Sequence, residues 1–389
     1  MTNPDRRIRR WLDVALDDYL LDLGTLVNRD CGTTYKAGVD EVIDWVELRM
    51  RQLGAMVQRR VEEKYGDMLL ARWRGKGKGR VLLSAHADTV YPIGTAAKRP
   101  MRRAEDDSNH LLGPGVCDMK SGLLSGLYAV GVLKALKLDQ WEEVAMIVNS
   151  EEEVGSPASH HWLKGLAKQY DAGLVLEAGR ENGNLVTGRK GGGIWQITVE
   201  GKAAHAGVEP EKGANAIIQM AYHALALNAL NGTIPTATVV VGTISGGEVA
   251  NMVPPLAKME VDIRALNPAA LKALVKAIQV TLAANEGRVP GTRTIVKGGI
   301  RTTAMARRAE NLRLFALAKE SAAAQNFTID EQVTGGISDA NYLAQSGLPV
   351  LDGLGPVGGL DHSPDEYVRI DSIVPRTAML AGLIYRLCT

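Results

Sequence analysis

The chain has 389 residues, of which 46% are hydrophobic and 23% are charged. This composition is typical of a folded soluble protein, and the length predicts two domains of about 100–200 residues each. Lysine and arginine total 45 against 44 aspartates and glutamates, so the formal net charge is +1. Because such a balance gives no general attraction to nucleic acid or to an anionic membrane, we expect partners of neither kind. We expect small molecules or a second copy of the chain.

The N-terminal segment is not expected to be a secretion signal. The arginines of 6–10 are followed by aspartates instead of an apolar stretch. Apolar residues of 12–23 recur at helical spacing, which predicts one amphipathic helix. No apolar run approaches the roughly 18 residues of a membrane span, so we expect a soluble, cytoplasmic protein. The cysteines, Cys31, Cys117 and Cys388, lack the spacing of a zinc finger or a disulfide framework.

The first half of the chain predicts an α/β fold. Apolar residues of 39–53 repeat at helical spacing up to Gly54, which predicts a helix that ends there. Short apolar runs then predict strands at 81–85, 144–148 and 174–176, with a helix at 121–137. Continuous apolar strands separated by helices indicate a mixed, mostly parallel sheet with helices on both faces.

The pattern changes from about residue 191 onward. Strands are predicted at 195–199, 238–244, 258–264 and 292–297, and helices at 214–230 and 268–284. The resulting order, βαββαβ, is that of a ferredoxin-like domain. The first pattern resumes afterwards and supplies a histidine motif near the end of the chain. We therefore predict a domain of 191–300 inserted into a catalytic domain of 1–190 and 301–389.

Polar side chains follow three of the predicted strands at the point where each strand ends, which is where open α/β sheets bind ligands. They are His86, Asp88, Glu152, Glu153 and Glu177. Asp118 ends a glycine-rich turn, and His362 lies in the late histidine motif. Two imidazoles and several carboxylates without a thiolate cluster fit zinc or another borderline divalent ion.

A two-metal site needs one ligand shared by two ions about 3.5–4 Å apart. Asp118 suits this role, because its two oxygens can face different metals. In an extended segment, His86 and Asp88 point the same way, so Asp88 can hold the far nitrogen of the imidazole. A helix or turn cap is the alternative for Asp88. Adjacent Glu152 and Glu153 point in different directions, so one can bind metal while the other moves protons.

Eight stretches of the chain resemble, in order, the motifs of one family. They are SAHADTVYP, GPGVCDMKSG, NSEEEVGS, VLEAGR, GKAAHAG, the NMVPP…VDIR pair, TGGISDANY and DHSPDEYV. In these motifs the chain resembles the zinc metallopeptidase family of glutamate carboxypeptidase, acetylornithine deacetylase and succinyl-diaminopimelate desuccinylase, and glutamate carboxypeptidase most of all. The resemblance implies a phosphorylase/hydrolase-like α/β fold that binds two zinc ions, with cobalt or manganese as substitutes.

The resemblance also implies a role for each polar residue after the strands. One zinc would be held by His86, Asp118 and Glu177, and the other by Asp118, Glu153 and His362. Glu152 would be the general base, and Asp88 the carboxylate that orients a zinc-bound imidazole. The implied reaction is hydrolysis of an amide bond by activated water, in a peptide or an N-acyl amino acid.

Within the predicted insertion, the resemblance singles out His205, Asn251 and Arg264. His205 would stabilise the oxyanion, commonly from the partner subunit of a dimer. Asn251 and Arg264 would lie near the substrate, where Arg264 could bind a carboxylate in bidentate fashion. Arg264 could instead pair with Asp262 or Glu260 on its own strand.

Gly336 belongs to a stretch, 335–339, that resembles the pocket loop of the family. We therefore expect a small amide or peptide substrate with a free carboxylate, and a homodimer formed through the inserted lid domain. Arg189, Lys190 and Arg301 depart from the pattern of glutamate carboxypeptidase. For this reason the preference for glutamate is not carried over.

Two alternatives remain open from the sequence. One is a protein that binds metal without catalysis, and the other is an aminopeptidase, which requires a free amine on its substrate. Four further histidines lack a flanking motif and are expected to be ordinary surface or core residues; they are His110, His160, His161 and His223.

Overall fold

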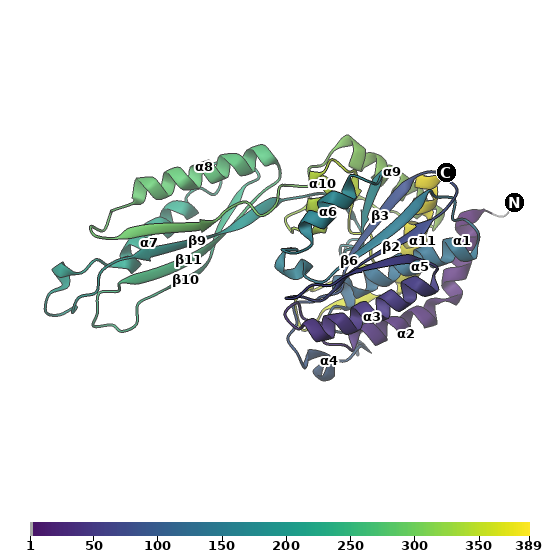
Figure 1. Ribbon diagram of the computed structural model, residues 1–389, viewed down its shortest axis with the longest axis horizontal. Coiled ribbons are helices and arrows are strands. Elements are labelled where there is room, and N and C mark those ends of the chain that lie inside the picture. The colour runs from purple at the N-terminus through teal and green to yellow at the C-terminus, as the bar shows by residue number, and fades with distance from the viewer. Residues whose placement is uncertain (1–2) are drawn as a thin grey trace. The chain divides into compact units, whose positions relative to one another are not determined.

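The computed structural model describes residues 3–389, which form two compact units (Figure 1). The first contains the chain up to Thr187 together with Arg307–Val333 and Ser338–Thr389, and the second contains Gly188–Ala306 and Thr334–Ile337. Each unit has its own hydrophobic core. The stretch 191–300 lies within the second unit, which also includes the short segment that carries Gly336.

A six-stranded sheet forms the centre of the first unit, in the order β1-β2-β6-β3-β7-β14. Its strands are β1 (Met56–Arg60), β2 (Met68–Arg74), β3 (Arg80–His86), β6 (Glu143–Asn149), β7 (Ala172–Val175) and β14 (Val350–Leu351). β3 runs parallel to β6 and β7, and β7 to β14, whereas β1 and β2 form an antiparallel edge. Every residue of β6 is buried, as expected for a strand covered on both faces. The predicted mixed, mostly parallel sheet is confirmed.

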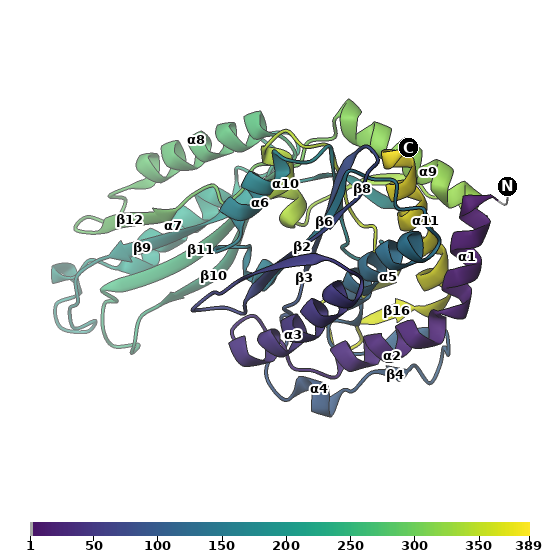
Figure 2. The same cartoon turned by 45° about the vertical axis from the view of Figure 1, so that its right-hand side comes forward.

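Helices lie on both sides of this sheet. Figures 1 and 2 show α2, α3 and α5 on one side and α6 and α10 on the other, while α11 packs against α1, α5 and α9. The helices are α1 (Pro4–Val14), α2 (Leu16–Val27), α3 (Lys36–Gln52), α4 (Thr95–Lys98), α5 (Ser121–Ala135), α6 (His160–Ala167), α9 (Ala309–Ala324), α10 (Asp339–Gln345) and α11 (Ile370–Cys388).

The single helix predicted for 12–23 is wrong, because two helices meet there. α1 ends at Val14 and α2 begins at Leu16. Leu12 of α1 and Leu23 of α2 are both buried; α1 packs against α11 and α5, and α2 also packs against α5. Helical spacing of apolar residues does not reveal a break of one residue when both pieces pack against the same core.

The expectation that no apolar run reaches the length of a membrane span is also wrong. The helical stretch Val116–Ala135 has 20 residues, and its most apolar window has a mean hydropathy of 1.2. However, 89% of that window is buried inside the molecule. A helix that is apolar all round is typical of a protein core as well as of a membrane, and the burial of α5 accounts for this composition.

Smaller elements complete the fold. A four-stranded sheet has the order β15-β16-β5-β4, and a two-stranded sheet pairs β13 with β8. Their bounds are β4 (Arg102–Arg103), β5 (His110–Leu112), β15 (Gly358–Gly359), β16 (Tyr367–Arg369), β8 (Leu185–Arg189) and β13 (Glu331–Thr334). Two helical turns, η1 (Val116–Lys120) and η2 (Glu152–Val154), carry predicted site residues.

The second unit is one antiparallel sheet with two helices, in the chain order βαββαβ. Its elements are β9 (Gly191–Glu200), the turn η3 (Pro210–Lys212), α7 (Ala216–Asn228), β10 (Thr238–Gly246), β11 (Leu256–Ala265), α8 (Pro268–Asn285) and β12 (Arg293–Gly298). The strands are ordered β10-β11-β9-β12. Burial alternates along β11, because its apolar side chains face the helices and its charged ones face away.

Candidate metal centre

Three neighbouring parallel strands bring polar side chains to one edge of the central sheet. β3 ends at His86, and it lies between β6 and β7. The chain leaving β6 enters η2, which begins with Glu152 and Glu153. Glu177 follows the end of β7. Because parallel strands end at the same edge, residues far apart in the sequence meet there.

The carboxylate of Asp118 faces both predicted histidine ligands. Its Oδ1 lies 3.2 Å from Nε2 of His86, and its Oδ2 lies 3.3 Å from Nε2 of His362. The same nitrogen of His86 is 3.9 Å from Oε1 of Glu177. Nε2 of His362 is 3.1 Å from Oε2 of Glu153. The two oxygens of Asp118 therefore face two different groups of potential ligands.

Asp88 lies behind His86, on the side opposite Asp118. Nδ1 of His86 is 3.3 Å from Oδ1 of Asp88 and 3.0 Å from its main-chain oxygen. The Asp88 carboxylate also accepts hydrogen bonds from the main-chain N–H groups of Glu152 and Glu153, at 3.2 and 3.3 Å. A single buried carboxylate thus contacts both the imidazole and the turn that carries the two glutamates.

Within residues 3–389, two sets of three side chains have potential ligand atoms within 4.8 Å of one another. They are His86, Asp118 and Glu153, and His86, Glu152 and Glu177. Glu152 therefore lies on the side of His86 and Glu177, whereas Glu153 lies beside His362. By position alone, Glu152 can act either as a metal ligand or as a base next to the metals.

The charges at this edge of the sheet fit bound cations. Burial raises the pKa of Glu152 well above its ordinary value, and the Glu177 carboxylate adds to this rise. Burial also raises the pKa of Glu153 to about 7, although His362 lowers it. Burial opposes ionisation of Asp118 too, but its hydrogen bonds to His362 and His86 hold its pKa below the usual range. A divalent zinc ion would offset the excess negative charge of these buried carboxylates. Its usual ligands include the nitrogen and oxygen atoms found here.

Comparison with known proteins identifies the family. The sequence profile of Peptidase family M20/M25/M40 matches residues 82–386. The chain belongs to this family. It is therefore a hydrolase of peptide or N-acyl amino acid bonds, and family membership implies metal dependence.

Relatives in this family include enzymes named for different activities. The chain is 31% identical to carboxypeptidase G2 of Pseudomonas sp. (strain RS-16) over 93% of its own length and 87% of that protein. It is 27% identical to acetylornithine deacetylase of Edwardsiella ictaluri over 82% of its length and 83% of that enzyme. Among solved structures, a Staphylococcus aureus tripeptidase matches with a TM-score of 0.82 at 21% identity, covering 96% of this chain and 98% of the other. At that identity, the structural match supports the fold alone.

Glu366 is a residue of the centre that the sequence analysis did not single out. Its buried carboxylate accepts main-chain N–H groups from Gly115, Cys117 and Asp118 at 2.8, 2.8 and 2.9 Å. It also accepts the hydroxyl hydrogen of Tyr91 at 2.7 Å. Glu366 thereby holds the turn that presents Asp118. Its place in the DHSPDEYV motif is the only sequence signal that pointed to it.

Two further buried residues support the edge of the sheet. Thr33 donates its hydroxyl hydrogen to Oδ2 of Asp88 at 2.7 Å. Asp339 ends the stretch interpreted as a pocket loop, but it is buried at the start of α10. Its oxygens accept hydrogen bonds from Ser156 and Asn149, both at 2.5 Å. Asp339 thus holds the segment after β6 that carries the glutamates.

His205 and Asn251 lie beside each other in the second unit, and both are exposed. His205 forms an antiparallel bridge with Met252, and the main-chain oxygen of Asn251 accepts the N–H of Ala206 at 3.0 Å. Nδ1 of His205 accepts the N–H of Gly207 at 3.1 Å, which leaves Nε2 as the nitrogen facing away from the backbone. The segments that carry these two residues are therefore paired within their own unit.

Arg264 is paired with Asp262, as one alternative in the sequence analysis anticipated. Its Nε and Nη2 donate to the two oxygens of Asp262 at 2.9 and 3.2 Å. Its Nη1 donates to the main-chain oxygen of Gly335 at 2.8 Å. The next carbonyl, that of Gly336, accepts from Nη1 of Arg189 at 3.3 Å. The predicted pocket loop thus lies against two arginines of the second unit.

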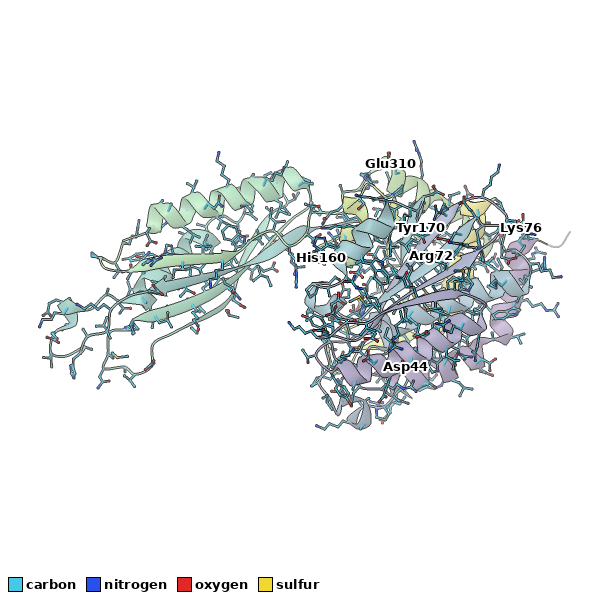
Figure 3. All side chains as sticks on the ribbon, in the orientation of Figure 1. Asp44, Arg72, Lys76, His160, Tyr170 and Glu310 are labelled. Atoms are coloured by element: carbon cyan, nitrogen blue, oxygen red, sulfur yellow. The ribbon has the colours of Figure 1, made fainter. Side chains whose placement is uncertain are left out.

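The four histidines expected to be ordinary residues belong to neither potential metal group found in residues 3–389. His160, labelled in Figure 3, lies on α6 and its Nδ1 is 3.0 Å from the main-chain oxygen of Ser156. His223 is buried in the second unit beside Gln219 and Thr294. Burial lowers the pKa of His223, which favours its neutral form.

Proposed function

We propose that the chain is a two-zinc hydrolase that cleaves the amide bond of a small peptide or N-acyl amino acid bearing a free carboxylate. One observation carries this proposal: the two oxygens of Asp118 face the Nε2 atoms of two different histidines, His86 and His362. A bridging carboxylate between two ligand sets is what a two-metal site requires.

The side chains divide into two sets around this bridge. Zinc ions bound there would lower the pKa of a water molecule and polarise the carbonyl of the substrate. One ion would be held by His86, Asp118 and Glu177, and the other by Asp118, Glu153 and His362. Cobalt or manganese could take the same nitrogen and oxygen donors. Asp88 would act as a positioning residue, because its carboxylate contacts Nδ1 of His86.

Glu152 is the proposed general base. Burial and the neighbouring Glu177 raise the pKa of its carboxyl, which favours proton uptake from water. The acid formed would then give the proton to the nitrogen of the departing amine. Glu153 is less suited to this exchange, because its carboxylate is engaged by His362 at 3.1 Å.

The second unit would supply contacts to the substrate. His205 is exposed, and its ring would donate a hydrogen bond to the oxygen that gains charge as water attacks the carbonyl. Asn251, Arg264 and Gly336 would line the substrate side of this unit. Arg264 would bind the free carboxylate by exchanging Asp262 for the ligand, since one guanidinium fork fits either carboxylate.

Carboxypeptidase or deacylase action is favoured over aminopeptidase action. The relatives that align over most of the chain include carboxypeptidase G2 and acetylornithine deacetylases. The aminopeptidase and tripeptidase structures that match share only 21% of the sequence, so they support the fold and not the substrate.

A homodimer formed through the second unit is part of the proposal. β10 is an edge strand, and its Val240 and Ile244 are 54% and 55% exposed. Leu225 and Ile218 on α7, which packs beside β10, are 73% and 47% exposed. The free edge of β10, together with the exposed apolar side chains of this strand and of α7, is a surface that a symmetric partner can cover. Light scattering should give the mass of a dimer, and a strict monomer would contradict this part.

A hydrolysis screen tests the reaction. N-acyl amino acids and dipeptides should be cleaved, cleavage should stop after exhaustive chelation, and added zinc should restore it. Blocking the carboxylate of a substrate should reduce cleavage, whereas acylating its amine should not. Full activity after chelation would overturn the metal mechanism, and a requirement for a free amine would establish an aminopeptidase.

A further inference from the structure

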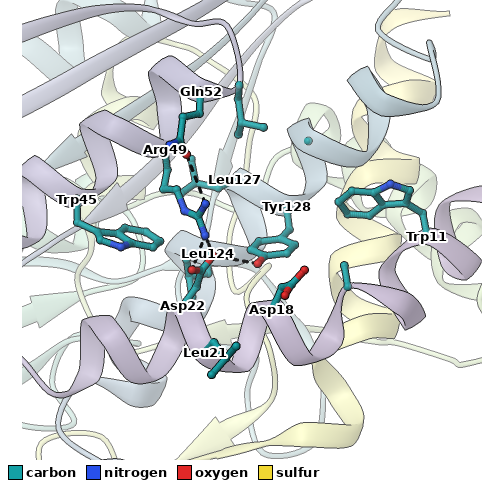
Figure 4. Close-up of a pocket in the computed structure, with 13 residues that line it drawn as sticks. Trp11, Asp18, Leu21, Asp22, Trp45, Arg49, Gln52, Leu124, Leu127 and Tyr128 are labelled. Atoms are coloured by element: carbon teal, nitrogen blue, oxygen red, sulfur yellow. Dashed lines mark hydrogen bonds and ion pairs between the residues drawn. The ribbon is translucent and has the colours of Figure 1, made fainter.

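A cavity away from the metal centre lies in the first unit, between helices α1, α2, α3 and α5 (Figure 4). Its volume is 460 Å³. Pockets that bind small molecules have volumes of roughly 300–1,000 Å³, so this cavity is large enough for one. The described residues that line it include no member of the metal centre. A ligand bound there would therefore be separate from the hydrolysed substrate.

Three aromatic side chains from three helices line this cavity, which we call the aromatic pocket. They are Trp11 of α1, Trp45 of α3 and Tyr128 of α5. Figure 4 shows the two indoles at opposite ends with Tyr128 between them. The rings of Trp11 and Tyr128 meet edge to face, with centroids 6.5 Å apart and planes at 60°. All three side chains are only partly buried, so the pocket presents aromatic surface to solvent.

A fixed ion pair occupies the middle of the aromatic pocket. Arg49 pairs with Asp22, and the guanidinium lies 5.1 Å from the centre of the Trp45 ring. Tyr128 donates its hydroxyl hydrogen to Oδ2 of Asp22 at 2.9 Å. The positive charge of Arg49 is therefore offset by Asp22, and both groups are held in place by aromatic neighbours.

Asp18 gives the aromatic pocket a surplus negative charge. It lies one helical turn before Asp22 and lines the same cavity. Its carboxylate has neither a hydrogen bond nor an ion pair with any residue in 3–389. An acid in the first turn of a helix is favoured by the helix dipole, but Asp17 meets that need equally and does not line the pocket. The dipole therefore does not explain why Asp18 lines a pocket that contains three aromatic side chains.

We propose that the aromatic pocket binds an organic ammonium ion. Aromatic faces attract cations held within about 6 Å, and Asp18 supplies the opposite charge. An anion would meet two carboxylates there. A purely apolar ligand would remove Asp18 from water without giving it a partner, which costs free energy. A small amine or quaternary ammonium carrying an aromatic or alkyl group satisfies both the rings and the charge.

Calorimetric titration of the zinc-loaded full chain with benzyltrimethylammonium tests this proposal. Benzyl alcohol and benzoate serve as neutral and anionic counterparts of similar size. We expect saturable binding of the cation, about tenfold or more tighter than binding of either counterpart. Equal binding of the cation and benzyl alcohol, or no binding of the cation, would overturn the proposal.

Matched variants locate the binding to the pocket. Asp18→Asn and Trp11→Leu should each weaken binding of benzyltrimethylammonium by about tenfold. Asp17→Asn removes the same charge from the same helix but outside the pocket, so it should bind like the wild type. Both aspartates are exposed, and neither change is expected to disturb folding. Unchanged binding in Asp18→Asn, or an equal loss in Asp17→Asn, would contradict the assignment.

Discussion

The metal centre and the site residues of the second unit are held in different ways. His86 and Asp88 are each 1% exposed, and each contacts other buried polar groups. His205 is exposed and is held only through neighbouring segments of its own unit, and Arg264 pairs with Asp262 on the same strand. Except for His362, whose side chain is 53% exposed, the proposed ligands are buried or half-buried, and such ligands with several partners keep their geometry before substrate arrives. Exposed side chains with local partners can exchange them for a ligand, so metal binding and substrate binding should respond differently to mutation.

The largest effect is expected at Glu152, where proton transfer and metal binding should separate most clearly. Glu152→Gln keeps the shape of the side chain but removes its ability to take a proton. We expect turnover to fall by about 10²–10⁴-fold while zinc content stays unchanged. Steady-state kinetics with elemental analysis measure both quantities. If Glu152→Gln loses zinc and Glu153→Gln keeps it, the two roles have been assigned the wrong way round.

The next largest effect is expected at His205, a site residue of the second unit. His205→Ala should lower turnover by about 10²–10³-fold, because it removes a donor to the developing oxyanion. Zinc content should not change, since none of the proposed ligands lies in the second unit. His161→Ala, an exposed histidine of the first unit, is the matched control and should behave like the wild type. Normal turnover in His205→Ala would mean that this residue takes no part in the reaction.

Glu366 should affect the metal rather than the substrate. Glu366→Gln replaces one acceptor oxygen with an N–H₂ group that faces main-chain donors, so the turn holding Asp118 loosens. We expect zinc affinity to fall by about 10–100-fold, as for other groups that orient ligands. Competition with a chelator of known affinity measures this change. Asp365→Asn, an exposed neighbour, is the control, and an equal effect in both variants would refute the positioning role.

The smallest effect is expected at Arg264, because its charge is already offset by Asp262. Arg264→Ala should raise KM by about tenfold for a substrate with a free carboxylate, with little change in kcat. The same substrate with its carboxylate converted to an amide should show no such rise. Asp262→Asn should lower KM for the free carboxylate, because the guanidinium no longer needs to exchange partners. Equal effects on both substrates would exclude a carboxylate contact.

The sequence predicted the strands that lead to His86, Glu152 and Glu177, because each apolar run ends directly before or shortly before its polar residue. It did not identify Glu366 as a support for Asp118. That support acts through main-chain N–H groups, and the two residues are 248 positions apart along the chain. Contacts of this kind depend on how loops return to each other, which local patterns do not encode.

Among the helices too, one was predicted from the sequence and one break was missed. The predicted helix 121–137 corresponds to α5, Ser121–Ala135, because its apolar run is long and continuous. The break at Ala15 was missed, because apolar spacing continues through it while both helices pack against α5. The aromatic pocket was also missed, but for a different reason. Trp11, Trp45 and Tyr128 come from three helices, and only the packing of those helices brings them together.

The central claim is that Asp118 bridges two metal ions, and zinc stoichiometry tests it most directly. Elemental analysis after dialysis should give about two zinc ions per wild-type chain, as a bridged pair requires. His362→Ala should retain about one zinc ion, because His86 and Glu177 remain with Asp118. Asp118→Ala should retain almost none, since both ligand sets lose their shared carboxylate. A wild-type chain with a single zinc ion, or an Asp118→Ala variant that keeps two, would contradict the account.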